Sequence, residues 1–287
     1  MNIKNQALVG CHVSIAGGFF KAIQEGMEIG CTAVQIFTKS NRSWSAKPIT
    51  EHDAQEFITA QKNSSIAMVV AHASYLINLG SSNFDVVEKS YAALVDEIKR
   101  CQTLQIPYLV LHPGTSEPGK TRHTAAKTGE YINKALQATP ESSTTVLVET
   151  MAGQGNSIGS SFQELAEILN VVTEKNRIGI CFDTCHAFAS GYDFTTQSNY
   201  ATTFKLFDNT IGLQYLKMFH INDSKKELNS RVDRHENIGS GSIRLRAFEM
   251  IMNDPAFATI PKILETPKGD GLENDKKNLA KLISLIQ

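Results

Sequence analysis

The sequence predicts an α/β protein, a closed (β/α)8 barrel formed as a single domain by residues 1–287. Eight short apolar, β-branched runs alternate with eight longer segments in which apolar residues recur with the period of a helix. The runs are apolar on both faces, which indicates parallel strands buried between two layers. A doubly wound open sheet is the alternative fold. No G-x-G-x-x-G motif follows the first run to support it.

The individual elements follow from these patterns. Strands are expected at residues 8–13, 33–38, 67–72, 108–112, 145–150, 178–183, 215–221 and 262–266. Helical periodicity is clear at residues 84–104, 161–172 and 272–286. No low-complexity linker or change in composition divides the chain, so the barrel accounts for its whole length.

Composition limits the classes of partner. A formal net charge of -1 excludes bulk polycation binding to nucleic acid or membranes, but it allows a local basic patch. The first ten residues lack the apolar core of a signal peptide, and no apolar run approaches the ~18 residues of a membrane span. We expect a cytoplasmic protein with reduced cysteines, in which Cys181 packs in a strand instead of binding zinc with Cys185.

Polar residues of metal-ligand type stand at the ends of six predicted strands. In a (β/α)8 barrel, catalytic groups come from the C-terminal ends of several strands. Alone, each of these residues is as well explained as a hydrogen-bonded polar group at the barrel mouth. Together they are expected to face one bowl: His72, His112, Glu149, Asp183, His220 and Glu265.

Electrostatics favours a metal in that bowl. Three of these side chains are carboxylates, and in a cavity of low dielectric they repel one another and are driven towards protonation. A divalent cation relieves the repulsion. Mixed imidazole and carboxylate ligation is typical of zinc, with manganese or iron as alternatives.

The loop "RVDRHENIG", residues 231–239, adds further candidates. Asp233 and His235 are two positions apart, so on an extended segment their side chains point the same way. A solvated loop with an incidental ion pair is the alternative for an isolated D-x-H. His186 completes a third set with them, and we do not expect it to share a coordination sphere with Asp183. His52 and His123 are expected in solvent, and His12 beside a ligand without being one.

Long motifs in register resemble the endonuclease IV family of apurinic/apyrimidinic (AP) endonucleases. They span residues 72 to 266 in order: "HASYLINL", "LHPG", "LVETMAGQG", "FDTCHAFASGYD", "MFHINDS", "SRVDRHENIG" and "ILETP". The segments "CHVSIAGG" and "FTKSNRSW" extend the similarity towards the N-terminus.

The resemblance implies a zinc enzyme that cleaves DNA 5' to an abasic site, leaving a 3'-hydroxyl and a 5'-deoxyribose phosphate. We also expect removal of 3'-blocking groups. Three zinc ions are implied, with manganese possible at one or more sites. The implied ligands are His72, His112 and Glu149 for the first, Glu149, Asp183, His220 and Glu265 for the second, and His186, Asp233 and His235 for the third. Glu149 and Glu265 are the expected catalytic carboxylates.

Loops at the same rim are expected to contact double-stranded DNA. The resemblance places Arg42, Tyr75 and Leu76 in the base stack at the lesion, where an abasic nucleotide has no base pairing to lose. Without the motif match, Tyr75, Leu76 and Trp44 would be read as loop anchors. Trp44, Lys39 and Arg231 complete the predicted DNA-binding set, of which the two charged residues are candidate phosphate contacts.

Two rival functions remain open from the sequence. A metal-dependent sugar isomerase or epimerase uses a similar barrel with one or two metals, whereas three sets of ligands are present here. A non-enzymatic lesion-binding module, with metals only bracing the barrel, is the second rival. Metal content distinguishes the nuclease from the isomerase. We expect a monomer that does not bind membranes.

Overall fold

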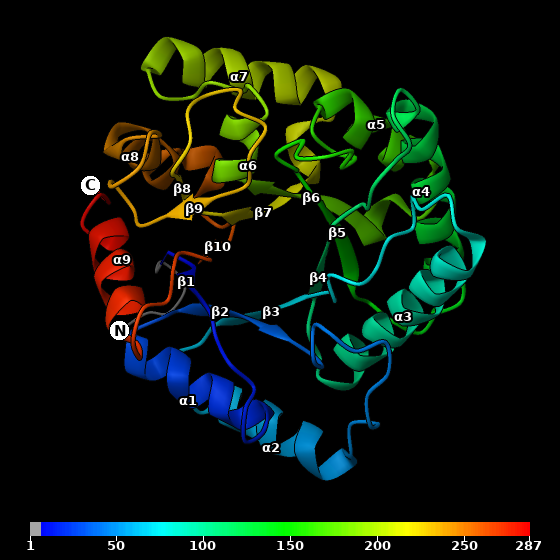
Figure 1. Cartoon of the computed structure of the whole chain (residues 1–287). Helices are drawn as coiled ribbons and strands as arrows, with labels where there is room; N and C mark the ends of the chain where they lie inside the picture. The colour runs from blue at the N-terminus through cyan, green and yellow to red at the C-terminus, as the bar shows by residue number, and fades with distance from the viewer. Residues whose placement is uncertain (1–6) are drawn as a thin grey trace.

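A closed parallel barrel forms the centre of the computed structural model, which describes residues 7–287 (Figure 1). The strand order around the barrel is β1-β10-β7-β6-β5-β4-β3-β2. These strands are β1 (Val9–His12), β2 (Ala33–Phe37), β3 (Met68–His72), β4 (Tyr108–Leu111), β5 (Thr145–Glu149), β6 (Ile178–Asp183), β7 (Leu216–His220) and β10 (Lys262–Leu264). The predicted fold class is confirmed, and every predicted strand is found within a few residues of its expected bounds.

Helices surround the barrel as an outer ring (Figure 1). They are α1 (Phe19–Ile29), α2 (Glu51–Lys62), α3 (Phe84–Thr103), α4 (Thr121–Gln137), α5 (Phe162–Val171), α6 (Thr184–Ala189), α7 (Gln197–Thr210), α8 (Leu245–Asn253) and α9 (Glu273–Ile283). Short 3-10 turns lie at η2 (Lys175–Arg177), η3 (Leu213–Tyr215) and η4 (Pro255–Phe257). The expectation of eight helices was wrong in one place, because two helices, α6 and α7, follow β6.

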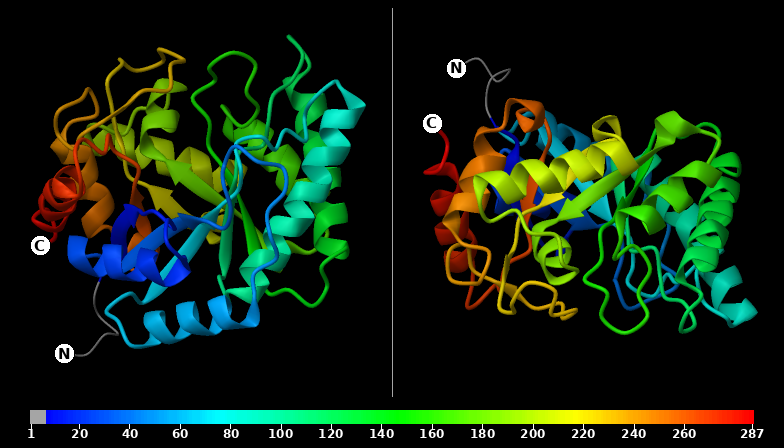
Figure 2. Two further views of the ribbon diagram at one scale, coloured as in Figure 1. Left: turned by 60° about the horizontal axis from the view of Figure 1, so that its bottom comes forward. Right: turned by 90° about the horizontal axis from the view of Figure 1, so that it is seen from above.

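A small antiparallel ribbon stands outside the barrel. It pairs β8 (Asp223–Ser224) with β9 (His235–Glu236). The loop between them and the loop between β5 and α5 project from the same end of the barrel (Figure 2). Because all barrel strands are parallel, this is the end at which every strand terminates. Residues from distant parts of the chain therefore meet there.

The apolar core has two layers. The larger layer lies between the helices and the outer wall of the barrel. A smaller layer fills the barrel interior: Ala33, Val70, Val110, Leu147, Cys181, Met218 and Ile263. Cys181 is a member of this inner layer, so its predicted packing role is confirmed. The inner layer closes the barrel and excludes water from beneath the strand ends.

The five cysteines are all buried, and none forms a disulfide: Cys11, Cys31, Cys101, Cys181 and Cys185. Within residues 7–287, no helix is long and apolar enough to cross a membrane. Most of the segment used to predict the absence of a signal peptide, residues 1–6, lies outside the described part of the chain.

Gly10 lets β1 and β2 approach closely enough to close the barrel. It is paired with Ala33, and a Cβ added to Gly10 would lie 1.6 Å from the Ala33 carbonyl oxygen. No side-chain rotation can relieve an overlap between Cβ and backbone. The two strands would have to separate.

We therefore expect Gly10→Ala to lower the free energy of unfolding by about 3 kcal/mol or more, measured by urea denaturation. Gly30→Ala is the matched control, because Gly30 has a φ of 95° and open space around its missing Cβ. It should cost less, since only backbone strain opposes it. Equal losses in the two variants would contradict the close-approach argument.

Candidate metal centre

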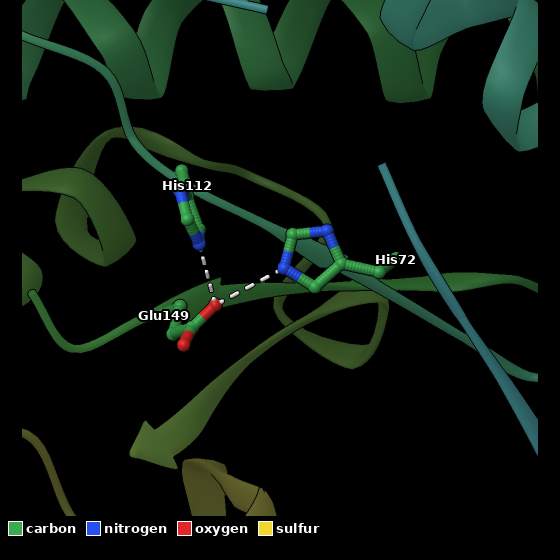
Figure 3. A group of neighbouring side chains, drawn as sticks. All are labelled: His72, His112 and Glu149. Atoms are coloured by element: carbon green, nitrogen blue, oxygen red, sulfur yellow. Dashed lines mark hydrogen bonds and ion pairs between the residues drawn. The ribbon is translucent and has the colours of Figure 1, made fainter. Parts of the chain in front are cut away.

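The first group of candidate ligands lies at the ends of three adjacent strands. His72 ends β3, His112 follows β4, and Glu149 ends β5. The Oε2 atom of Glu149 lies 3.3 Å from His72 Nε2 and 3.1 Å from His112 Nε2 (Figure 3). Both imidazoles thus point at one oxygen, as the predicted first set requires. His112 is partly exposed, so this group is open on one side.

The second group shares Glu149 with the first. Its members are Glu149, Asp183, His220 and Glu265, which each offer a ligand atom within 4.8 Å of the others. His220 Nδ1 is at the middle, 2.9 Å from Glu149 Oε1 and 3.4 Å from Glu265 Oε2. Glu149 therefore presents one oxygen to each group, which is the geometry of a bridging carboxylate.

The third group joins α6 to the β8–β9 ribbon. Asp233 Oδ2 lies 3.1 Å from His186 Nε2, and Asp233 Oδ1 lies 3.4 Å from His235 Nε2. One expectation needs correction. Asp183 caps α6 by accepting a bond from the His186 backbone N–H, and this turn brings ligand atoms of Asp183, His186 and His235 within 4.8 Å. Asp183 and His186 are thus close enough to share a cation.

Backbone carbonyls orient three of the imidazoles. His72 Nδ1 lies 2.7 Å from the Ala73 carbonyl, His186 Nδ1 2.9 Å from that of Thr150, and His235 Nδ1 3.0 Å from that of Glu265. A carbonyl only accepts, so each Nδ1 carries a proton and each Nε2 is left to face the bowl. Holding a ligand histidine by its other nitrogen is typical of protein metal sites.

Two uncharged residues that sequence reasoning missed hold the second group. Gln35 on β2 is fully buried; its Oε1 lies 2.8 Å from His220 Nε2, and its Nε2 donates to Glu265 Oε1 at 2.6 Å. Asn222 donates to Asp183 Oδ2 at 2.7 Å and accepts from the Glu265 backbone N–H at 2.8 Å. The available signal for Gln35 was one amide inside the otherwise apolar strand "AVQIF".

Two carboxylates of the bowl, Glu149 and Glu265, have depressed pKa values. Burial by itself would raise the pKa of Glu149, yet the adjacent His220 and His112 hold that pKa well below its usual range. Glu265 behaves alike: burial opposes ionisation, but His220 and His12 keep its pKa well below the ordinary value. Buried anions of this kind need positive partners at short range.

Two imidazole nitrogens support a cation as that partner. Within residues 7–287, His186 Nε2 and His235 Nε2 are buried and make no hydrogen bond. Both lie close to Asp233 oxygens but are not aligned for hydrogen bonding with them. The two Nε2 atoms instead face a shared space beside Asp233. Imidazole nitrogens in this arrangement are suitable ligands for a metal ion such as zinc.

A cavity of about 340 Å³ gives access to these groups. It is lined by Tyr75, His112, His186, Asp233, His235 and Glu265. Tyr75 is 52% exposed at its edge, with its ring centre 5.2 Å from that of His72 and 5.3 Å from that of His112. All three candidate groups thus contribute a residue to the wall of one space.

The remaining DNA-binding predictions have different outcomes. Arg42, Trp44 and Arg231 are exposed, and Leu76 is half-buried beside Tyr75. Lys39 was wrongly expected to meet phosphate. Its side chain is 1% exposed, and its ammonium lies 2.7 Å from Asp96 Oδ2 and 3.7 Å from Glu97 Oε1, so its charge is used within the protein.

The other histidines lie where the sequence predicted. His52 and His123 are exposed. His12 Nδ1 is 3.4 Å from Glu265 Oε1 and belongs to none of the candidate ligand groups in the described residues.

Comparison with known proteins agrees with this geometry. Residues 23–287 match the family model described as "Xylose isomerase-like TIM barrel". A "Probable endonuclease 4" of Chloroflexus aurantiacus is 46% identical over 278 residues, covering 97% of this chain and 98% of that protein. One from Trichlorobacter lovleyi is 45% identical over 277 residues, covering 96% and 99%.

Solved structures give the same assignment. The crystal structure of endonuclease IV from Thermus thermophilus superposes with a TM-score of 0.86 at 34% identity, covering 96% of this chain and 98% of that one. A D-tagatose 3-epimerase-like protein has a TM-score of 0.73 at 18% identity, which shows a shared fold alone. Because full-length relatives exceed 40% identity and the motifs carry the site, the chain belongs to the endonuclease IV family of xylose isomerase-like TIM barrels.

Proposed function

We propose that the chain is a zinc-dependent AP endonuclease acting in DNA base-excision repair. It hydrolyses the phosphodiester bond 5' to an abasic site in double-stranded DNA, giving a 3'-hydroxyl and a 5'-deoxyribose phosphate, and removes 3'-blocking groups. The observation that carries the proposal is the meeting of nine imidazole and carboxylate ligands at one barrel mouth: His72, His112, Glu149, Asp183, His186, His220, Asp233, His235 and Glu265.

The ligand groups fit three divalent ions per chain. The mixture of nitrogen and oxygen donors favours zinc, and manganese can replace it at one or more positions. Bound metal ions would supply an acidic water and neutralise the charge of the scissile phosphate. Glu149 holds the first two groups at a fixed separation through its two oxygens. Glu265 fixes the open face of the second group beside the cavity.

DNA reaches this mouth through the loops that surround it. Tyr75 at the edge of the cavity and Leu76 beside it are placed to fill the space left by a missing base, with Arg42, Trp44 and Arg231 around them. Extruding an abasic nucleotide costs less than flipping an intact one. The active unit is proposed to be a monomer in the cytoplasm, with residues 1–287 acting as one domain.

A sugar epimerase is the second candidate, supported by the shared barrel of the D-tagatose 3-epimerase-like protein. That likeness extends to the fold alone, whereas the third ligand group joins His186 on α6 to Asp233 and His235 of the β8–β9 ribbon and its loop, outside the barrel strands. A one- or two-metal isomerase has no use for this group. The nuclease is the function that uses every ligand.

Incision of a duplex containing a single abasic analogue tests the proposal directly. The purified chain should contain about three zinc ions by metal analysis and should cut the duplex only 5' to the analogue. Chelation should abolish cutting, and added zinc should restore it. Cutting that persists after complete metal removal, or one to two metals with sugar epimerisation, would overturn the proposal.

Glu149→Gln and Glu265→Gln are each expected to lower the incision rate by more than about 100-fold, because each loses a charged ligand oxygen. The fold should remain, as followed by circular dichroism, since the amide has the same shape. Glu141→Gln, which alters an exposed glutamate before β5, is the matched control and should cut normally. Wild-type activity in either test variant would refute its role.

The role of Gln35 can be tested by measuring zinc affinity, without an activity assay. By accepting from His220 Nε2, it leaves Nδ1 with the lone pair that faces the three carboxylates. Gln35→Met keeps the volume but removes this acceptor. We expect zinc affinity to fall by about 10- to 100-fold in competition with a chelating dye. Gln137→Met, on the exposed end of α4, should bind zinc normally, and equal affinity in both would disprove the role of Gln35.

A further inference from the structure

Two neighbouring loops carry the side chains proposed to probe DNA. Residues 38–50 leave β2 and carry Arg42 and Trp44, and residues 73–83 leave β3 and carry Tyr75 and Leu76. These side chains can enter one lesion together only if the two loops keep a constant separation. Loops held in the bound arrangement before binding lose less conformational entropy when DNA arrives.

One buried carboxylate bonds both loops. Glu97 on α3 is 1% exposed and lies behind the rim. Its Oε2 accepts from the Thr38 hydroxyl at the start of the first loop, and its Oε1 accepts from the Ser74 backbone N–H in the second loop at 3.3 Å. Each loop therefore bonds to a different oxygen of the same group.

Neighbouring contacts strengthen this connection. Arg100, one turn further along α3, donates to the Thr38 carbonyl at 2.6 Å and to the Lys47 carbonyl at 2.9 Å. The loops also meet directly, because the Ser74 hydroxyl donates to the Asn41 carbonyl at 2.9 Å. Asn41 and Ser74 each directly precede a predicted DNA-probing residue, Arg42 and Tyr75.

The cost of burying this carboxylate calls for an explanation. Burial raises the pKa of Glu97, and the Lys39 ammonium opposes that rise. Glu97 belongs to none of the candidate ligand groups in residues 7–287, so metal binding does not account for it. A buried ionisable group is expensive compared with an apolar residue of similar size. Its two loop contacts are what an apolar residue could not supply.

We propose that Glu97 is a positioning residue for lesion recognition, which holds the Arg42 loop and the Tyr75 loop at a fixed separation through its two oxygens. The proposal rests on the DNA-repair function proposed above. It concerns binding of the damaged duplex, and neither the metal ions nor the chemical step depends on it.

Glu97→Gln tests the proposal with the full chain loaded with zinc. The amide keeps the shape but loses the negative charge and half of the accepting capacity. The Kd for a duplex with one abasic analogue should rise about tenfold, whereas zinc content and kcat at saturating duplex stay unchanged. A melting temperature that falls while Kd stays constant would mean a structural role alone and would overturn the proposal.

Three further variants sharpen the outcome. Glu88→Gln alters an exposed glutamate on the same helix and should bind normally. Ile98→Val lowers stability at a buried apolar side chain of α3 that carries no polar group, so its Kd should not change. Thr38→Val removes the hydroxyl that donates to Glu97 Oε2 and should raise Kd, which provides a second test if Glu97→Gln fails to fold.

A double variant shows whether Glu97→Gln changes the Kd by displacing Tyr75 or in another way. In a Tyr75→Ala background, Glu97→Gln should raise Kd by less than about twofold, because the side chain that it positions is gone. Full additivity would contradict the proposal. Failure of the wild-type chain to cut abasic duplex would instead refute the proposed function. Normal wild-type cutting with unchanged Kd in Glu97→Gln and Thr38→Val would refute this inference alone.

Discussion

The structure depends on buried carboxylates gathered at the end of a parallel barrel. Glu149 and Asp183 are fully buried, and Glu265 is nearly so. Burial alone disfavours their charge, and the surrounding imidazoles reverse that preference for Glu149 and Glu265. A cation in the space between such anions stabilises them further. The parallel strand order sets where they meet, and the histidines set what they can bind.

The same constraint explains why the ligands are held so firmly. Carbonyls orient His72, His186 and His235, and the amide of Gln35 orients His220. Each imidazole is therefore already in the tautomer that binds metal, and binding requires little rearrangement. Beneath them lies the largely apolar interior layer of the barrel. A metal centre prepared in this way suits repeated hydrolysis, because its geometry does not depend on substrate.

The barrel strands and the ligands at their ends could be predicted from the sequence. The roles of Lys39 and Gln35 could not, because they depend on partners that are distant along the chain. Strands buried on both faces give continuous apolar runs, so each β-strand of the barrel and each polar residue at its end could be predicted. Lys39 looked like any basic loop residue, and only the fold places it against Asp96 and Glu97. Gln35 is similar: one amide in an apolar strand has no meaning until His220, 185 residues away, lies beside it.

The distribution of charge shows how a nearly neutral chain can bind DNA. The net charge is -1, and Lys39 is neutralised internally, so this lysine adds no positive field at the mouth. The mouth itself contains four carboxylates, Glu149, Asp183, Asp233 and Glu265, which without metal repel a phosphate backbone. The three divalent ions proposed above would carry six positive charges, which would reverse the sign of the mouth. On that proposal, metal loading would create both the reactive centre and the attraction for the substrate, which would confine tight binding to the place where cleavage occurs.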